Sequence, residues 1–78
     1  MLKIKDNVDL EELEKFGYDK YTDFKDYCYI KTLPTDREIN ITSKREIYSF
    51  SEIDVRPAQE FEVKDLIQAG LVEKVEKE

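Results

Sequence analysis

Alternating apolar and polar residues mark the strands that the sequence predicts at its two ends. Leu2 and Ile4 alternate with Lys3 and Lys5, which is the period-two pattern of a half-buried strand. The sequence LVEKVEK, residues 71–77, reads as another short strand, which can pair with the first. We therefore expect the two ends of the chain to lie side by side.

Three further segments of strand type follow one another in the middle of the chain. We predict strands at residues 26–33, 37–42 and 46–51, separated by the turn-forming sequences Pro-Thr-Asp and Ser-Lys-Arg. These connections are too short for parallel crossovers, so the strands are expected to form an antiparallel meander. Residues 52–56 are expected to be extended or irregular, because Pro57 disfavours helix in the residue before it.

Residues 9–16 show helical spacing with a defined start and stop. Asp9 can cap the free amides of the first turn, and Glu12, three residues later, would complete a capping box. Gly17 stands where a left-handed residue ends a helix, and Tyr18 would then fold back onto that helix.

A second helix is predicted from residue 57 to residue 69. Its apolar side chains recur at intervals of three and four residues, and Pro57 suits its first position. Gly70 supplies a left-handed stop, after which Leu71 can contact Leu66 in a Schellman arrangement.

These elements predict a single α+β domain that spans residues 1–78. Their order is β-α-β-β-β-α-β, with a mostly antiparallel sheet and two helices on one face. A chain of 78 residues is long enough for one domain of this kind. Residues 19–25 fit either a short helical turn or an aromatic-rich loop, and the pattern does not choose between them.

The segment DLIQAGLVEKV, residues 65–75, resembles the junction between a DNA-reading helix and a wing in winged-helix regulators. Such a reader needs basic and polar side chains on the helix and a β-hairpin after it. The predicted helix carries one lysine against three acidic residues, and only three residues follow Val75. We therefore interpret the segment as a helix stop followed by an edge strand.

Charge gives the chain an acidic character that is spread along its whole length. The net charge is −6, from 19 acidic and 13 basic side chains, and each half carries −3. An evenly acidic surface repels phosphate backbones and anionic membranes, so we predict no direct nucleic-acid binding and no membrane partner. No segment is long or apolar enough for a membrane span or an export signal, so a cytoplasmic location is expected.

Residues able to carry catalysis or bind a metal are sparse. The chain has no histidine, which removes most general-base arrangements and most zinc sites. The single cysteine, Cys28, lies in an apolar, strand-like context typical of a buried thiol. Asp19, Asp23 and Asp26 lack the spacing of an EF-hand loop. We therefore predict a protein that is not an enzyme and has no cofactor and no metal site.

The most distinctive feature is the aromatic segment between residues 18 and 29. In one interpretation the rings cap a small core, with their phenol oxygens reaching water. In the other they form a protein-binding face, whose acidic rim steers it toward a basic surface. The candidate partner-binding residues are Tyr18, Tyr21, Asp23, Phe24, Asp26, Tyr27 and Tyr29.

The two ends of the chain resemble those of a group of small proteins encoded by phages and prophages of Gram-positive bacteria. The likeness rests on MLKIKDNVDLEELEKFGY, residues 1–18, and DLIQAGLVEKVEK, residues 65–77. In that group similar ends frame a more variable β segment rich in Tyr and Lys. The resemblance implies an intracellular phage accessory protein, and it implies no catalytic residue or cofactor.

Three functions follow as hypotheses. The leading one is a non-enzymatic phage or prophage accessory protein that binds a host or phage protein of unknown identity. The second is an acidic mimic of DNA that inhibits a nucleic-acid-binding protein. The third is a structural or self-associating protein, with edge strands pairing across a homodimer.

Overall fold

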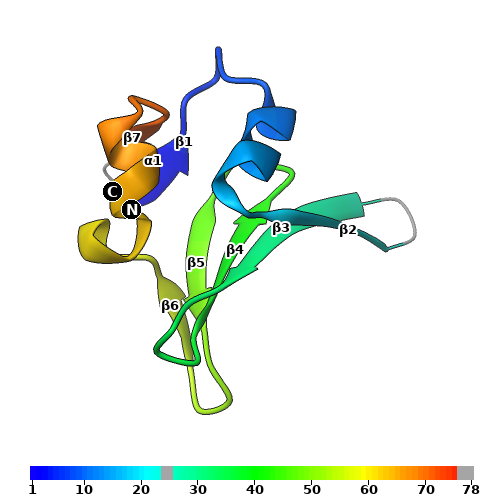
Figure 1. Ribbon diagram of the computed structural model, residues 1–78, viewed down its shortest axis with the longest axis vertical. Helices are drawn as coiled ribbons and strands as arrows, with labels where there is room; N and C mark the ends of the chain where they lie inside the picture. Colours follow the sequence, from blue (N-terminus) through cyan, green and yellow to red (C-terminus); the bar gives the residue numbers. More distant parts are fainter. Residues whose placement is uncertain (24–25, 76–78) are drawn as a thin grey trace.

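The computed structural model describes residues 1–23 and 26–75, which form one α+β domain (Figure 1). Its strands are β1 (Leu2–Ile4), β2 (Asp19–Asp23), β3 (Asp26–Thr32), β4 (Glu38–Thr42), β5 (Ile47–Phe50), β6 (Val55–Pro57) and β7 (Val72–Lys74). Its helical segments are the 3₁₀ helices η1 (Leu10–Phe16) and η2 (Glu60–Val63) and the α-helix α1 (Lys64–Gln68).

The expected antiparallel meander is confirmed, and it is longer than the sequence predicted. Strands β2 to β6 form one five-stranded antiparallel sheet in chain order. Residues 19–23, for which the pattern offered a helical turn or a loop, are its first strand. Residues 55–57 are its last strand, so the prediction that Pro57 begins a helix is wrong. Proline has no amide hydrogen to donate. It is tolerated there because β6 is an edge strand, with no further strand to accept a hydrogen bond on its outer side.

The two ends of the chain pair as expected but form a sheet of their own. Strands β1 and β7 are antiparallel, with Leu2 opposite Lys74 and Ile4 opposite Val72. A single bridge between Lys3 and Glu46 joins this pair to the beginning of β5. Figure 1 shows η1, α1 and the two terminal strands gathered around one end of the large sheet, while the β3–β4 and β5–β6 turns project at the other end.

One hydrophobic core holds these parts together. Side chains from both helical segments and from both sheets are buried in a single cluster, which is the arrangement expected for helices that pack on one sheet face. The most deeply buried members are Tyr29, Ile4, Leu13, Ile39, Ile41, Ile47, Leu66 and Val63.

The first helical segment begins and ends where the sequence predicted, as a 3₁₀ helix. The Asp9 carboxylate accepts a hydrogen bond from the Glu11 amide at 3.0 Å. The predicted capping box is incomplete, because the Glu12 carboxylate accepts from Lys15. Gly17 is left-handed with φ 90°, and the next amide turns back to the carbonyl of residue 13 at 3.3 Å.

The second helical segment begins later than predicted and ends as predicted. Its start is stabilised by the Glu62 carboxylate, which accepts from the Gln59 amide at 2.9 Å. Gly70 is left-handed with φ 77°. The Leu71 amide donates to the Leu66 carbonyl at 3.1 Å, which is the predicted Schellman arrangement.

A buried carboxylate ties this second segment to the sheet. The Glu62 side chain is 1% exposed and accepts two hydrogen bonds from the Arg56 guanidinium, at 2.8 and 3.0 Å. It also accepts from the Ser49 hydroxyl at 2.9 Å. Ser49 in turn accepts from Arg37 at 2.7 Å. The carboxylate therefore connects η2 to strands β5 and β6.

Stability should decrease in acid because of this carboxylate. Burial alone would raise the pKa of Glu62, but hydrogen bonds from Arg56, the Gln59 amide and Ser49 outweigh it and hold the pKa below its usual 4.5. A depressed folded-state pKa contributes stability that is complete above the unfolded pKa and is lost as the pH falls through the folded value. We expect the melting temperature to decline below about pH 4.5. Melting temperatures of the native chain and of Glu62→Gln, measured between pH 3 and 7, test this. If the melting temperature changes equally with pH in the two proteins, the prediction is contradicted.

Candidate functional site

Strand alternation divides the aromatic segment between the core and the surface. Tyr18 and Tyr29 are 2% and 1% exposed and belong to the core, so their assignment to an exposed binding face is corrected. Tyr27 is half-buried, whereas Tyr21 is 55% exposed. Asp23 and Asp26 are also exposed, and Phe24 lies outside the described residues. The core interpretation therefore applies to Tyr18 and Tyr29. The binding-face interpretation remains for the exposed residues Tyr21, Asp23 and Asp26.

The buried phenols are held in their neutral form. Burial raises the pKa of Tyr18, and the charge of Asp65 adds to this effect. Burial also raises the pKa of Tyr29, with smaller contributions from Glu14 and Glu11 on η1. These two tyrosines therefore act as large apolar side chains with a polar tip.

The strand register defines an open face of the five-stranded sheet, opposite the core. Residues of the covered face, such as Ile39 and Ile41, are fully buried, whereas their neighbours along the strand are partly or fully exposed. In register, Asp19, Ile30, Asn40, Tyr48 and Pro57 form one row across the open face. Its aromatic, aliphatic and other weakly polar side chains are Tyr21, Cys28, Ile30, Tyr48, Phe50, Val55 and Pro57.

Charges within the five strands are sorted between the two faces. The three basic residues, Lys20, Lys31 and Arg56, lie opposite the covered-face residues Tyr29, Ile39 and Ser49 and share their face. The four acidic residues all lie on the open face; they are Asp19, Asp23, Asp26 and Glu38. The sequence alone does not show this separation, because the register between neighbouring strands decides which charges share a face.

Each aromatic ring of the open face has a carboxylate beside it. Tyr21 lies between Asp19 and Asp23 on the same side of β2. Phe50 lies directly opposite Glu38 on the neighbouring strand. The third ring, that of Tyr48, is two residues from Glu46, and burial and this carboxylate together raise the pKa of the Tyr48 phenol. An apolar contact and an anionic contact are thus available at each of three points.

The β5–β6 turn carries an exposed apolar side chain that sequence reasoning missed. Ile53 is 91% exposed, and Val55, two residues later at the start of β6, is 60% exposed. The turn is nevertheless ordered by hydrogen bonds, since Ser51 and Arg37 both donate to Asp54, at 3.0 and 2.8 Å. The only sequence signal was an isolated isoleucine within a polar turn, a feature of many surface loops.

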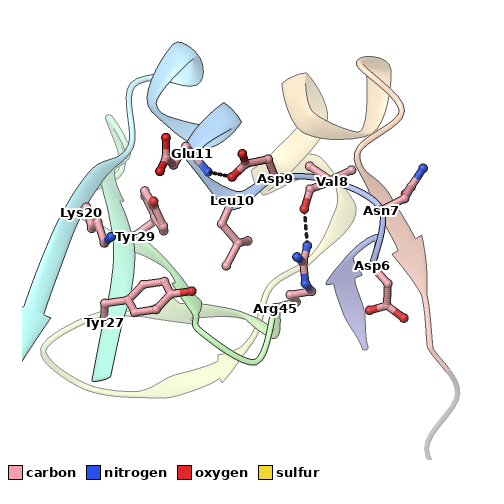
Figure 2. Close-up of a pocket in the computed structure, with 10 residues that line it drawn as sticks. All are labelled: Asp6, Asn7, Val8, Asp9, Leu10, Glu11, Lys20, Tyr27, Tyr29 and Arg45. Atoms are coloured by element: carbon pink, nitrogen blue, oxygen red, sulfur yellow. Dashed lines mark hydrogen bonds between the residues drawn. The ribbon is translucent and has the colours of Figure 1, made fainter. Parts of the chain in front are cut away.

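A polar cleft of about 420 Å³ lies between η1, the loop before it and strand β3 (Figure 2). Its two cations are already engaged. The Arg45 guanidinium donates to the carbonyls of Lys5 and Val8, at 2.8 and 2.5 Å, and Lys20 lies 4.7 Å from the centre of the Tyr27 ring. The cleft therefore fastens the N-terminal loop to the sheet, and its polar groups serve the fold.

Residues 1–23 and 26–75 offer neither a metal-binding cluster nor a membrane-spanning helix. This part of the chain holds no cluster of three or more side chains suited to a metal ion. None of its helices has the length and apolar character needed to cross a bilayer.

Comparison with known proteins identifies no relative. No protein-family model, curated protein or solved structure matches the chain significantly.

Proposed function

We propose that this chain is a protein-binding module that docks a basic partner surface on the open face of its five-stranded sheet. The observation that carries the proposal is the sorting of strand charges, with four carboxylates on this face and the three strand cations on the other. Such a face attracts cationic surfaces and repels anionic ones, which favours both the speed and the selectivity of association.

The apolar side chains of the face favour a protein partner over a small ion. Tyr21, Phe50 and Val55 are 55%, 44% and 60% exposed, and large exposed apolar groups within a polar surround are typical of interaction sites. Aromatic rings also provide contact area at a low cost in side-chain entropy. The combination suits a surface that presents both apolar and basic groups.

The biological setting that we propose is that of a phage or prophage accessory protein. This part of the proposal rests on the resemblance of residues 1–18 and 65–77 to such proteins. The partner would then be a host or phage protein, and the activity of the complex would belong to that partner.

Mimicry of DNA is the alternative that the acidic face also favours. A mimic would depend mainly on its carboxylates, so its binding should collapse between low and moderate salt. On this face aromatic and aliphatic side chains separate the carboxylates, which favours a mixed contact that keeps much of its affinity in salt. A symmetric dimer through the open face would oppose like charges, so self-association would have to use another surface, such as the terminal edge strands.

Site-specific photo-crosslinking tests the proposed face. A photoreactive residue at position 21 or 50 reports on the open face, and one at position 61 is a matched control. Phe61 is 70% exposed but lies on η2, outside the sheet. In bacterial cells we expect positions 21 and 50 to crosslink the same discrete protein and position 61 to give none of it. Equal crosslinking from all three positions, or only self-crosslinking, would contradict the proposal.

A further inference from the structure

A groove of about 290 Å³ lies on the open face beside Tyr21. Its base includes the small side chains of Cys28 and Thr42, which are cross-strand partners on β3 and β4. Larger residues stand around them, so the sheet surface is hollowed at this point. The lining residues are Tyr21, Asp23, Asp26, Tyr27, Cys28, Asn40 and Thr42.

Two carboxylates, those of Asp23 and Asp26, lie at one end of the groove. Asp23 and Asp26 are directly opposite in the β2–β3 register, and like charges in such a pair destabilise a sheet. Asp26 is held in place because its Oδ1 accepts from the Ser43 hydroxyl and from the Tyr27 amide. These two bonds, with a smaller contribution from Lys44, lower the pKa of Asp26 and keep it ionised. A cation placed between the two carboxylates would relieve their repulsion.

An unsatisfied acceptor lines the same groove. The Oδ1 atom of Asn40 is buried, and among the described residues no group donates a hydrogen bond to it. Leaving a buried acceptor without a donor costs free energy that a bound donor would recover. Because Oδ1 is closed off from the groove, a ligand rich in N–H groups would reach it only after the Asn40 side chain turns outward.

We propose that this groove binds the guanidinium group of an arginine side chain of the partner. The Tyr21 ring offers a face for stacking, and the carboxylates of Asp23 and Asp26 offer charged acceptors. The amide oxygen of Asn40 adds a neutral acceptor once its side chain turns toward the groove. A guanidinium is planar, carries five N–H donors and stacks on aromatic rings, whereas the compact lysine ammonium cannot meet these groups together. The inference rests on the proposed function and assigns the partner chemistry of one part of that face.

Two short peptides of equal charge test the inference. The first is acetylated, amidated Gly-Arg-Gly-Arg-Gly, and the second has lysine in place of both arginines. Each is titrated into the full-length ¹⁵N-labelled chain at 150 mM salt, and amide shifts report both affinity and location. We expect the arginine peptide to bind about two- to fivefold more tightly, because stacking on an exposed ring adds roughly 0.5–1 kcal/mol. The largest shifts should be at Tyr21, Cys28, Asn40 and Thr42.

Two variants separate the stacking contact from general attraction. Tyr21→Leu keeps apolar bulk but removes the ring, and it should weaken arginine binding about two- to fivefold and abolish the preference over lysine. Asp19→Asn removes one charge from the same face of β2 outside the groove, and it should leave the preference intact. Melting curves of both variants show whether the fold is retained.

Each contrary result has its own meaning. Equal binding of the two peptides at the open face would overturn the arginine site and leave the proposed basic partner standing. Shifts centred on the cleft of Figure 2 would overturn the assignment to this groove. Absence of binding by both peptides would overturn the arginine site and would also count against the proposed function.

Discussion

Replacement of Glu62 by alanine is expected to lower the free energy of unfolding by about 3 to 5 kcal/mol, the usual cost of breaking a buried ion pair on one side. The carboxylate is 1% exposed and accepts a bidentate pair of hydrogen bonds from Arg56. Its removal leaves the fully buried Ser49 hydroxyl without its acceptor and takes the carboxylate away from the Arg56 guanidinium, which is only 29% exposed. The Gln59 amide at the start of η2 loses its acceptor as well.

The size of this effect follows from where the carboxylate lies. Ser49 is fully buried on the covered face of β5, and Arg56 is on the edge strand β6. Glu62 connects both to the segment that leads into α1. Losing it should therefore detach the second helical segment from the sheet and expose the core residues Val63 and Leu66.

A nearby glutamate provides the matched control. Glu60 pairs with Lys74 at 2.8 Å, but both side chains are largely exposed, and exposed pairs contribute little. Glu60→Ala should therefore change the urea midpoint far less than Glu62→Ala, with similar denaturant slopes. Comparable losses in the two variants would show that the buried network does not stabilise the fold as described.

The sequence predicted the elements whose signals are local. Gly17 and Gly70 end their helical segments as expected, because a left-handed residue is required there and glycine adopts it without strain. The pairing of the terminal strands was also predicted, since both are short apolar segments that need a partner. Strand β6 was missed, because three residues that include Pro57 carry too little pattern to be recognised.

The two faces of the sheet could not be predicted for a different reason. In β2 every residue is exposed and the sequence Asp-Lys-Tyr-Thr-Asp has polar groups on both sides, so periodicity does not distinguish them. Only the register with β3 places Tyr21 opposite Cys28 and Lys20 opposite Tyr29. The sorting of charges follows from that register. The buried bonds of Glu62 likewise depend on a contact between residues that no local pattern connects.

Replacement of Tyr29 by alanine is expected to lower the free energy of unfolding by about 3 to 5 kcal/mol, as for other buried aromatic residues. The side chain is 1% exposed, and its ring packs edge to face on Tyr27, with centroids 6.2 Å apart. The variant leaves a cavity between η1 and the sheet, in a domain too small to bury much other apolar surface. Urea denaturation followed by circular dichroism measures the loss.

The matched variant Tyr21→Ala tests whether the exposed ring of the aromatic segment serves binding or the core. Its ring is 55% exposed on the open face, so Tyr21→Ala should change the free energy of unfolding by no more than about 0.5 kcal/mol, as surface substitutions usually do. The same variant should lose much of the binding to the partner captured by crosslinking. A large stability loss at Tyr21 would mean that this ring serves the core. If stability and binding both stay at their native values, the binding surface must lie elsewhere, and the acidic open face would then serve only to keep the sheet solvated.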